Sequence, residues 1–201
     1  SIKLLGNSII KDDIFPAYRE LKLFFENEYY PNARENVAIS SIPKGAEYYK
    51  YLVKYHTTTD KTPVEIHQIG LKEVKRIKIE MDKIIKNLKF EGSFSDFLNF
   101  LRTSPQFYYD NPDDLIDGYR AICKRVDPEL SKFFGKLPRI PYGVKPIPEY
   151  QAVTSPTAYY YGPSADGERP GYFWANTYNL KMRPKYEMAV LAIHEAVPGH
   201  H

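Results

Sequence analysis

The sequence is poor in the features that mark several large classes of protein. It holds one cysteine among 201 residues, so it can form no internal disulfide. No apolar run approaches the roughly 18 residues of a membrane span, and no signal peptide is present. The net charge is only +3, with the lysines interleaved with acidic residues rather than clustered. These absences argue against a disulfide scaffold, a membrane span in this chain and a nucleic-acid-binding surface.

Apolar and aromatic residues are plentiful. Hydrophobic residues make up 43% of the chain, which is enough to build a core. There are 18 tyrosines and 11 phenylalanines, and many tyrosines stand in pairs or triplets. The simplest interpretation is that these rings pack at the rim of the core with their hydroxyls in water. A groove for a peptide or a glycan is the alternative, and it is best supported around residues 159–178.

Residues 1–135 carry helical signals. Thr62-Pro63-Val64-Glu65 predicts an N-cap, a proline in the first turn and a capping box. Apolar residues then recur every three or four positions as far as Leu88, which predicts one long amphipathic helix. Further helices are expected from Asp12 or Asp13 to Glu28, over 45–55, over 94–101, and from about 112 to between 127 and 135.

The pattern changes after Gly135. Too many prolines follow for a helix, and residues 144–153 favour an extended edge strand. Residues 159–170 favour a loop or hairpin turn, and 171–177 a second strand. Pro184 then opens a final helix. We therefore predict a single domain over 1–201 of α+β class, predominantly α-helical, with strands and loops in 136–180. A small antiparallel sheet precedes a metal-motif helix in 181–201.

The last eight residues hold the strongest functional signal. They read His194-Glu195-Ala196-Val197-Pro198-Gly199-His200-His201 and contain three of the five histidines. In zinc peptidases, imidazoles bind the ion and a glutamate acts as base on a metal-activated water. The second histidine normally follows four residues after the first, where this chain has Pro198. On a straight helix His200 would point to the far side, and His201 would lie roughly 10 Å along the axis.

The proline–glycine pair offers a way around this spacing. Pro198 cannot donate to the carbonyl of His194, so the helix must bend or stop there. Gly199 permits a positive φ, which would let the chain fold back. One of the two last histidines can then approach His194. The shorter bend favours His200 over His201, and the choice between them stays open.

The same residues resemble a known family. The motif from His194 to His201 is similar to the signature of the bacterial family called domain of unknown function 885, whose members are grouped with gluzincin-type zinc peptidases. Three other segments fit this resemblance. They are Thr57–Thr59 with 62–71, residues 166–173, and Asn176-Thr177 with Arg183-Pro184.

The resemblance implies a mostly helical zinc metallopeptidase or related hydrolase. His194 with His200 and His201 would supply the metal ligands, and Glu195 would be the catalytic base. Gluzincins take a further glutamate ligand from a downstream helix, so we expect this chain to be a trimmed fragment that binds zinc weakly or not at all. The resemblance also favours the cell envelope or secretion over the cytoplasm. The oligomeric state is left open.

The expected substrate is a peptide or a peptide-like molecule. The strand over 171–177 is the candidate edge on which such a peptide could pair through its main chain, and an ordinary strand with its aromatic residues in the core is the alternative. Arg169 could clamp its carboxylate, although pairing with Asp166 or Glu168 is the simpler expectation. Tyr172, or Tyr160 or Tyr161, could donate to an oxyanion. Asn176 completes the candidate substrate contacts. Two alternatives remain: a metal-free peptide- or glycan-binding module, and a hydrolase that uses another metal or cleaves an ester or a non-peptide amide.

Overall fold

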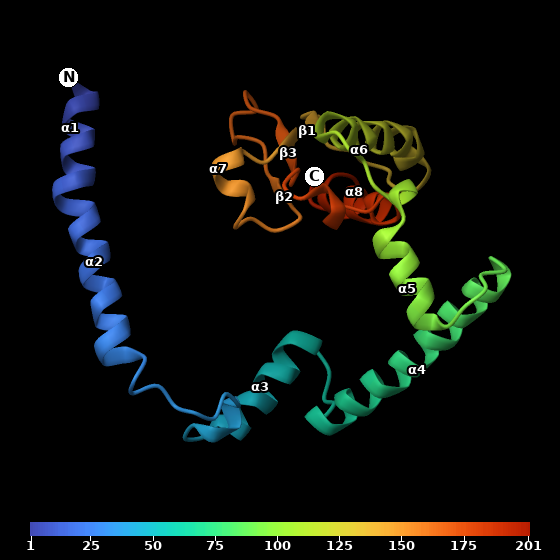
Figure 1. Ribbon diagram of the computed structural model, residues 1–201, viewed down its shortest axis with the longest axis horizontal. Helices are drawn as coiled ribbons and strands as arrows, with labels where there is room; N and C mark the ends of the chain where they lie inside the picture. Colours follow the sequence, from blue (N-terminus) through green and yellow to red (C-terminus); the bar gives the residue numbers. More distant parts are fainter. The chain divides into compact units, whose positions relative to one another are not determined.

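The computed structural model describes residues 1–201 and divides into two compact units, residues 1–80 and 81–201 (Figure 1). Helices predominate in both units, and the strands all lie in the second. The predominantly helical α+β class expected from the sequence is confirmed. No helix is both long enough and apolar enough to cross a membrane.

The first unit is built from helices with little buried surface. It begins with a helical stretch of α1 (Ile2–Ile9), a π-helical turn, α2 (Phe15–Phe24) and a second π-helical turn ending at Tyr29. This stretch starts about ten residues before the predicted Asp12, because Ser1 caps it by accepting from the Leu4 N–H. A 3₁₀ turn at Ile39–Ser41 and α3 (Gly45–Thr57) follow.

The long helix α4 (Pro63–Asn87) begins with the predicted capping box. The Glu65 carboxylate accepts from the Thr62 N–H at 2.7 Å, and the Thr62 hydroxyl accepts from the Glu65 N–H at 3.2 Å. These two bonds satisfy N–H groups that have no partner within the helix. Accordingly, the pKa of Glu65 is held below its usual value, chiefly by the hydrogen bond from the Thr62 backbone.

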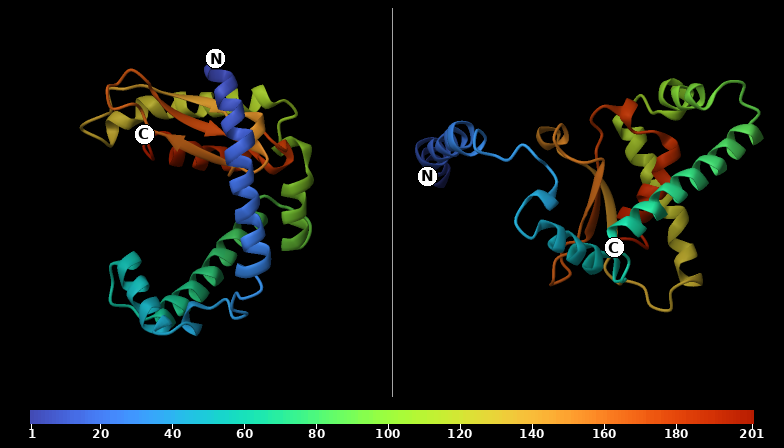
Figure 2. Two further views of the ribbon diagram at one scale, coloured as in Figure 1. Left: turned by 90° about the vertical axis from the view of Figure 1, so that its left-hand side faces the viewer. Right: turned by 90° about the horizontal axis from the view of Figure 1, so that it is seen from below.

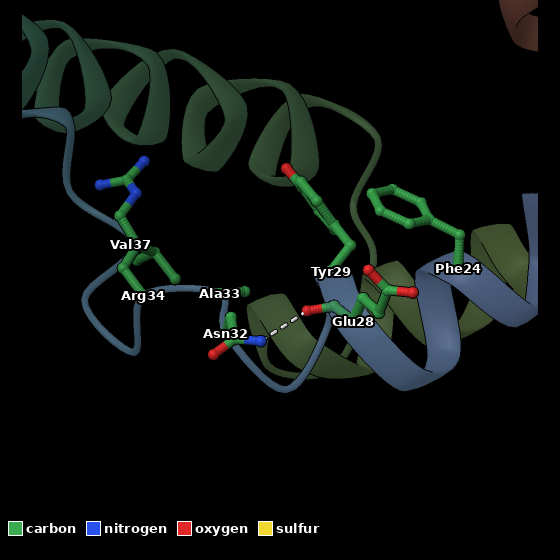
Figure 3. A pocket seen from close by; sticks show the side chains of 7 residues that line it. All are labelled: Phe24, Glu28, Tyr29, Asn32, Ala33, Arg34 and Val37. Carbon is green, nitrogen blue, oxygen red and sulfur yellow. Dashed lines mark hydrogen bonds between the residues drawn. The ribbon is translucent and has the colours of Figure 1, made fainter.

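A surface hollow in the first unit follows the end of the N-terminal helical stretch (Figure 3). Its one hydrogen bond between lining residues runs from the Asn32 side chain to the Glu28 carbonyl at 2.8 Å. The Arg34 guanidinium is bonded to the Asn36 and Ala38 carbonyls and the Ser41 hydroxyl. The side chains around the hollow therefore do not form a cluster of catalytic or metal-binding groups.

The second unit contains the sheet and most of the core. Its elements are α5 (Phe94–Thr103), α6 (Pro112–Val126), β1 (Tyr142–Pro146), α7 (Glu149–Ala152), β2 (Ala158–Tyr161), β3 (Gly171–Ala175) and α8 (Met188–Glu195). Short 3₁₀ segments lie at Pro105–Phe107, Asp127–Lys132, Leu180–Met182 and Lys185–Glu187.

The sheet is mixed rather than antiparallel, and its strand order is β1-β3-β2 (Figure 2). β3 pairs with β1 in parallel and with β2 in antiparallel register. The expected antiparallel sheet is therefore only half right. Two local predictions also fail: residues 149–152 form α7 rather than strand, and 159–161, expected in a loop or hairpin turn, belong to β2. The triple tyrosine forms a strand because β3 provides it with a pairing partner.

One face of the sheet is covered by α6 and α8. Phe173 is completely buried on that face, and its ring meets the Tyr119 ring edge-on at 4.9 Å. The same cluster includes Leu115 from α6 and Met188 and Ala192 from α8. Burial raises the pKa of Tyr119 to about 12, so its hydroxyl stays protonated at neutral pH. This core fixes α8, which carries the metal motif, against the sheet.

Candidate functional site

Helix α8 places the motif at the border between core and solvent. Met188 and Ala192 point into the core, whereas Val190 and His194 are exposed. The helix ends at Glu195, because Ala196 leaves helical geometry with φ −104° and ψ −107°. The predicted break of the helix next to Pro198 is therefore present, and it starts at Ala196.

The chain then folds back over the end of α8. The Gly199 N–H donates to the Ile193 carbonyl and the His200 N–H to the His194 carbonyl, each at 3.0 Å. The His201 N–H donates to the Ala196 carbonyl at 2.9 Å. Pro198 has no N–H to donate to the His194 carbonyl, so the His200 N–H donates to it instead.

Gly199 is needed for space and not for the reason expected from the sequence. Its φ lies outside the left-handed region. A Cβ atom at this position would lie 1.8 Å from the His194 carbonyl oxygen and 2.6 Å from that of Ile193. Only glycine allows the backbone to pass so close to the helix end. The expectation of a positive φ is wrong, although the expected fold-back occurs.

The fold-back brings His194, Glu195 and His200 together. Each offers one ligand atom, and these atoms lie within 4.8 Å of one another. The His194 and His200 rings meet edge to face at 5.0 Å, and Nε2 of His200 lies 3.9 Å from the Glu195 carboxylate. Both imidazoles are exposed, whereas Glu195 is 8% exposed. The cluster therefore consists of two exposed imidazoles beside a largely buried carboxylate.

His201 does not join this cluster through its ring. Nδ1 lies 2.6 Å from the Tyr160 hydroxyl, and Nε2 lies 2.9 Å from the Ile140 carbonyl oxygen. Both ring nitrogens are therefore occupied by protein groups. Of the three histidines predicted as ligands, the structure brings His194 and His200 together and directs His201 elsewhere.

A pocket of about 510 Å³ adjoins the cluster and includes His194 and Glu195 in its lining. Residues that lie three or four positions apart along one side of α8 form its floor, and its wall is largely apolar. The other lining residues are Thr157, Tyr186, Glu187, Val190 and Leu191. Glu187 lines the pocket but is not part of the metal-type cluster.

Arg169 lies in the loop between β2 and β3. Its guanidinium stands over the Tyr161 ring at 4.5 Å and donates to the Pro170 carbonyl. It forms no ion pair with Asp166 or Glu168, contrary to the simpler expectation. The Asp166 carboxylate instead accepts from the Ser164 hydroxyl and the Glu168 N–H, and these bonds lower its pKa. The charge of the half-buried Arg169 also contributes to this lowering of the pKa, although its guanidinium makes no close ion pair.

Tyr172 projects from the sheet face opposite to α6 and α8, since buried Phe173 alternates with it. Its ring lies under the Lys145 ammonium at 3.7 Å and near the Trp174 ring. Tyr172 is therefore not directed at the cluster of His194, Glu195 and His200, and the structure does not support it as an oxyanion donor there.

Asn176, the third predicted substrate contact, is a buried structural residue. Its amide nitrogen donates to the carbonyls of Ala152, Ser155 and Pro156, and its oxygen accepts from the Tyr178 N–H. It is only 1% exposed. These bonds leave no side-chain polar atom of Asn176 for a substrate. The prediction of a substrate contact is therefore wrong, and Asn176 instead holds the loop before β2 in place.

Replacing Asn176 with alanine should destabilise the second unit by about 2–5 kcal/mol, because several buried polar groups lose their partner. The measurement is chemical denaturation of the protein. Asn99, on the exposed side of α5, provides the matched control, and Asn99→Ala should change stability by less than about 0.5 kcal/mol. Equal stability of the two variants would contradict the structural role.

The free edge of the sheet beside α8 is β2 and not β3. Residues 171–177 were the expected edge, yet β3 is paired on both sides. The Asn176 N–H donates to the Thr157 carbonyl, so the alternation of an antiparallel pair turns the main-chain groups of Ala158 and Tyr160 outward. β2 contacts α8, so this unpaired edge lies beside the metal-motif helix.

Comparison with known proteins supplies the family. Residues 3–201 match the family described as "Bacterial protein of unknown function (DUF885)". The chain belongs to this family. A DUF885 assignment agrees with the resemblance inferred from the terminal motif, and it adds no activity.

A solved structure is similar as well. It is described as the crystal structure of "the putative lipoprotein from Colwellia psychrerythraea", with 30% identity and a TM-score of 0.88. The match covers 96% of this chain but 34% of that protein, so this chain spans about a third of its relative's length. No curated protein matches.

Sequence reasoning did not foresee the pairing of Tyr160 with His201. A usable signal exists in Tyr159-Tyr160-Tyr161. Side chains alternate between the two faces of a strand, so a strand here places Tyr160 on the opposite face from Tyr159 and Tyr161. That face is the one on which buried Ala158 and Phe173 meet the helices.

Proposed function

We propose that this DUF885 chain carries the metal-binding histidines and the general base of a zinc-dependent hydrolase that acts on peptides. The observation that carries the proposal is the convergence of His194, Glu195 and His200 at the end of α8. Two imidazoles suit zinc as ligands, and the carboxylate beside them suits the role of base. A third protein ligand, as in gluzincins, would follow His201 in a longer polypeptide.

The geometry of the three side chains fits such an ion. Nitrogen ligands of tetrahedral zinc lie about 3.4 Å apart when each bond is about 2.0–2.1 Å. The present separations are up to 4.8 Å, and a turn of the exposed His194 ring can shorten them. When bound, zinc would lower the pKa of a water molecule and polarise the scissile carbonyl.

Glu195 is positioned to act as the base. Its carboxylate is held in the protein at the end of α8, next to both imidazoles, with 8% of the residue exposed. It would accept a proton from the attacking water and pass it to the leaving amine. Glu195 is the last residue of α8, so the helix places it next to the turn that carries His200.

The edge of β2 would hold the substrate. Outward N–H and C=O groups at Ala158 and Tyr160 can pair with an extended peptide of any sequence. The adjoining pocket of about 510 Å³, with Val190, Leu191 and Tyr186 in its wall, would accept an apolar side chain of that peptide. Both features lie beside α8, which supports a peptide over a small polar substrate.

Zinc content provides the direct test. The full-length protein should bind zinc, and His194→Ala or His200→Ala should weaken binding by more than about 100-fold, beyond the loss expected for outer partners. His67→Ala is the control, since His67 lies on α4 and outside the cluster. Unchanged zinc affinity in His194→Ala would refute the ligand assignment.

A metal-free binding module is the second candidate, and the far face of the sheet favours it. Tyr159 stacks on Trp174 with an interplanar angle of 21°, and Tyr172 and Lys145 lie next to them. Half-exposed rings with a cation form a surface typical of peptide or glycan recognition. Ligand binding that is lost in Trp174→Ala and insensitive to chelators would support this function over hydrolysis.

We also propose that the protein acts at the bacterial cell envelope. The support is the description of the similar Colwellia protein as a lipoprotein. Fractionation of the source bacterium, with detection of the full-length protein, tests this location, and recovery in the cytoplasm alone would contradict it.

A further inference from the structure

His201 has a defined hydrogen-bond state in the structure. A backbone carbonyl can only accept, so the contact between Nε2 and the Ile140 oxygen requires a proton on Nε2. In the neutral ring Nδ1 then carries the lone pair, and the Tyr160 hydroxyl donates to it at 2.6 Å. The ring therefore has no nitrogen left for a cation.

The surrounding backbone is shaped to hold this pair. A Cβ atom at Gly171 would lie 1.9 Å from the Tyr160 hydroxyl oxygen and 3.1 Å from Nδ1 of His201. Glycine at the start of β3 thus leaves room for the hydrogen bond. Ile140 comes just before β1, and the His201 N–H is fixed to the Ala196 carbonyl. His201 therefore ties the turn after α8 to the sheet.

Tyr160 also lies beside His200. The Tyr160 and His200 rings are nearly parallel, with an interplanar angle of 10° and centroids 6.3 Å apart. The other neighbouring ring of His200 is His194, at 85°. The Tyr160 ring thus faces one side of the exposed His200 imidazole. Rotation of Tyr160 would leave that side open.

We propose that His201 and Tyr160 form a positioning pair that holds the His200 imidazole in the orientation needed to bind a divalent cation. The two histidines of the terminal pair then have different roles: His200 is a ligand and His201 orients it through Tyr160. The pair is the counterpart of the outer groups that fix ligand imidazoles in metal sites. This inference rests on the proposed function, because that function identifies the cation as zinc.

Zinc affinity of the full-length protein, measured by competition with a chromophoric chelator, tests the pair. Tyr160→Phe removes one hydroxyl and should weaken zinc binding by about 10–100-fold, as loss of an outer partner does. His201→Ala should cause a loss of the same size with one zinc per chain retained. Tyr150→Phe is the control, because Tyr150 is an exposed tyrosine of the same unit whose hydroxyl only accepts from the neighbouring Gln151 side chain.

A double variant tells positioning from ligation. If both residues act through one hydrogen bond, Tyr160→Phe with His201→Ala should lose little more affinity than either single change. If His201 were a ligand, His201→Ala would match His200→Ala and Tyr160→Phe would match wild type. That result, or wild-type affinity in both single variants, overturns the pair.

Crystal structures of the metal-free wild type and Tyr160→Phe supply a readout that needs no zinc. The His200 ring should be turned away from its present orientation in the variant, and an unchanged ring overturns the proposal. If the wild type binds no zinc while His200 still turns in Tyr160→Phe, the proposed hydrolase fails and the positioning pair stands.

Discussion

Replacing Glu195 with glutamine should lower the kcat for peptide hydrolysis by about 10²–10⁴-fold, which is the usual contribution of a general base. Glutamine keeps the shape of the side chain and cannot accept the proton. Zinc binding should persist, because His194 and His200 remain. The measurement is cleavage of a defined peptide library by the full-length protein, followed by mass spectrometry, with zinc content determined on the same sample.

Glu149→Gln is the matched control. Glu149 is an exposed carboxylate of the same unit, at the start of α7, and has no hydrogen bond or ion pair in the structure. Its variant should cleave peptides like wild type. Full activity in Glu195→Gln would remove the proposed base, and release of alcohols from esters with no peptide cleavage would change the substrate class.

The helical part of the fold follows closely from local sequence. The capping box of Thr62 and Glu65 and the cap at Asn111 act within one turn, so their positions can be read without knowledge of the tertiary structure. The sheet could not be derived in the same way. Whether Tyr159–Tyr161 pairs with β3, and whether β1 joins in parallel, depends on partners distant in sequence.

The site shows the same division between local and distant causes. A helix break near Pro198 and a return of His200 follow from residues that are neighbours in the chain. The hydrogen bonds of the His201 ring depend on Ile140 and Tyr160, which lie 61 and 41 positions away in the sequence. Likewise, the Asn176 amide donates its hydrogen bonds to the loop that contains Ala152, Ser155 and Pro156. Residue type alone therefore left both as candidates for a functional role.

Gly199 is the position at which one methyl group should have the largest effect on metal binding. In Gly199→Ala the new Cβ would stand 1.8 Å from the His194 carbonyl oxygen, and that oxygen belongs to backbone that cannot swing away. The turn must open, and the hydrogen bond from the His200 N–H to this carbonyl is lost. His200 then moves away from His194 and Glu195.

We therefore expect Gly199→Ala to weaken zinc binding by about 100-fold or more, since a displaced ligand costs at least as much as a lost outer partner. Chelator competition measures the affinity, and circular dichroism confirms that the helices persist. Gly135→Ala is the control, because a Cβ there meets nothing within 4 Å. If Gly199→Ala bound zinc like Gly135→Ala, the close passage of the turn over α8 would not be what brings the two imidazoles together.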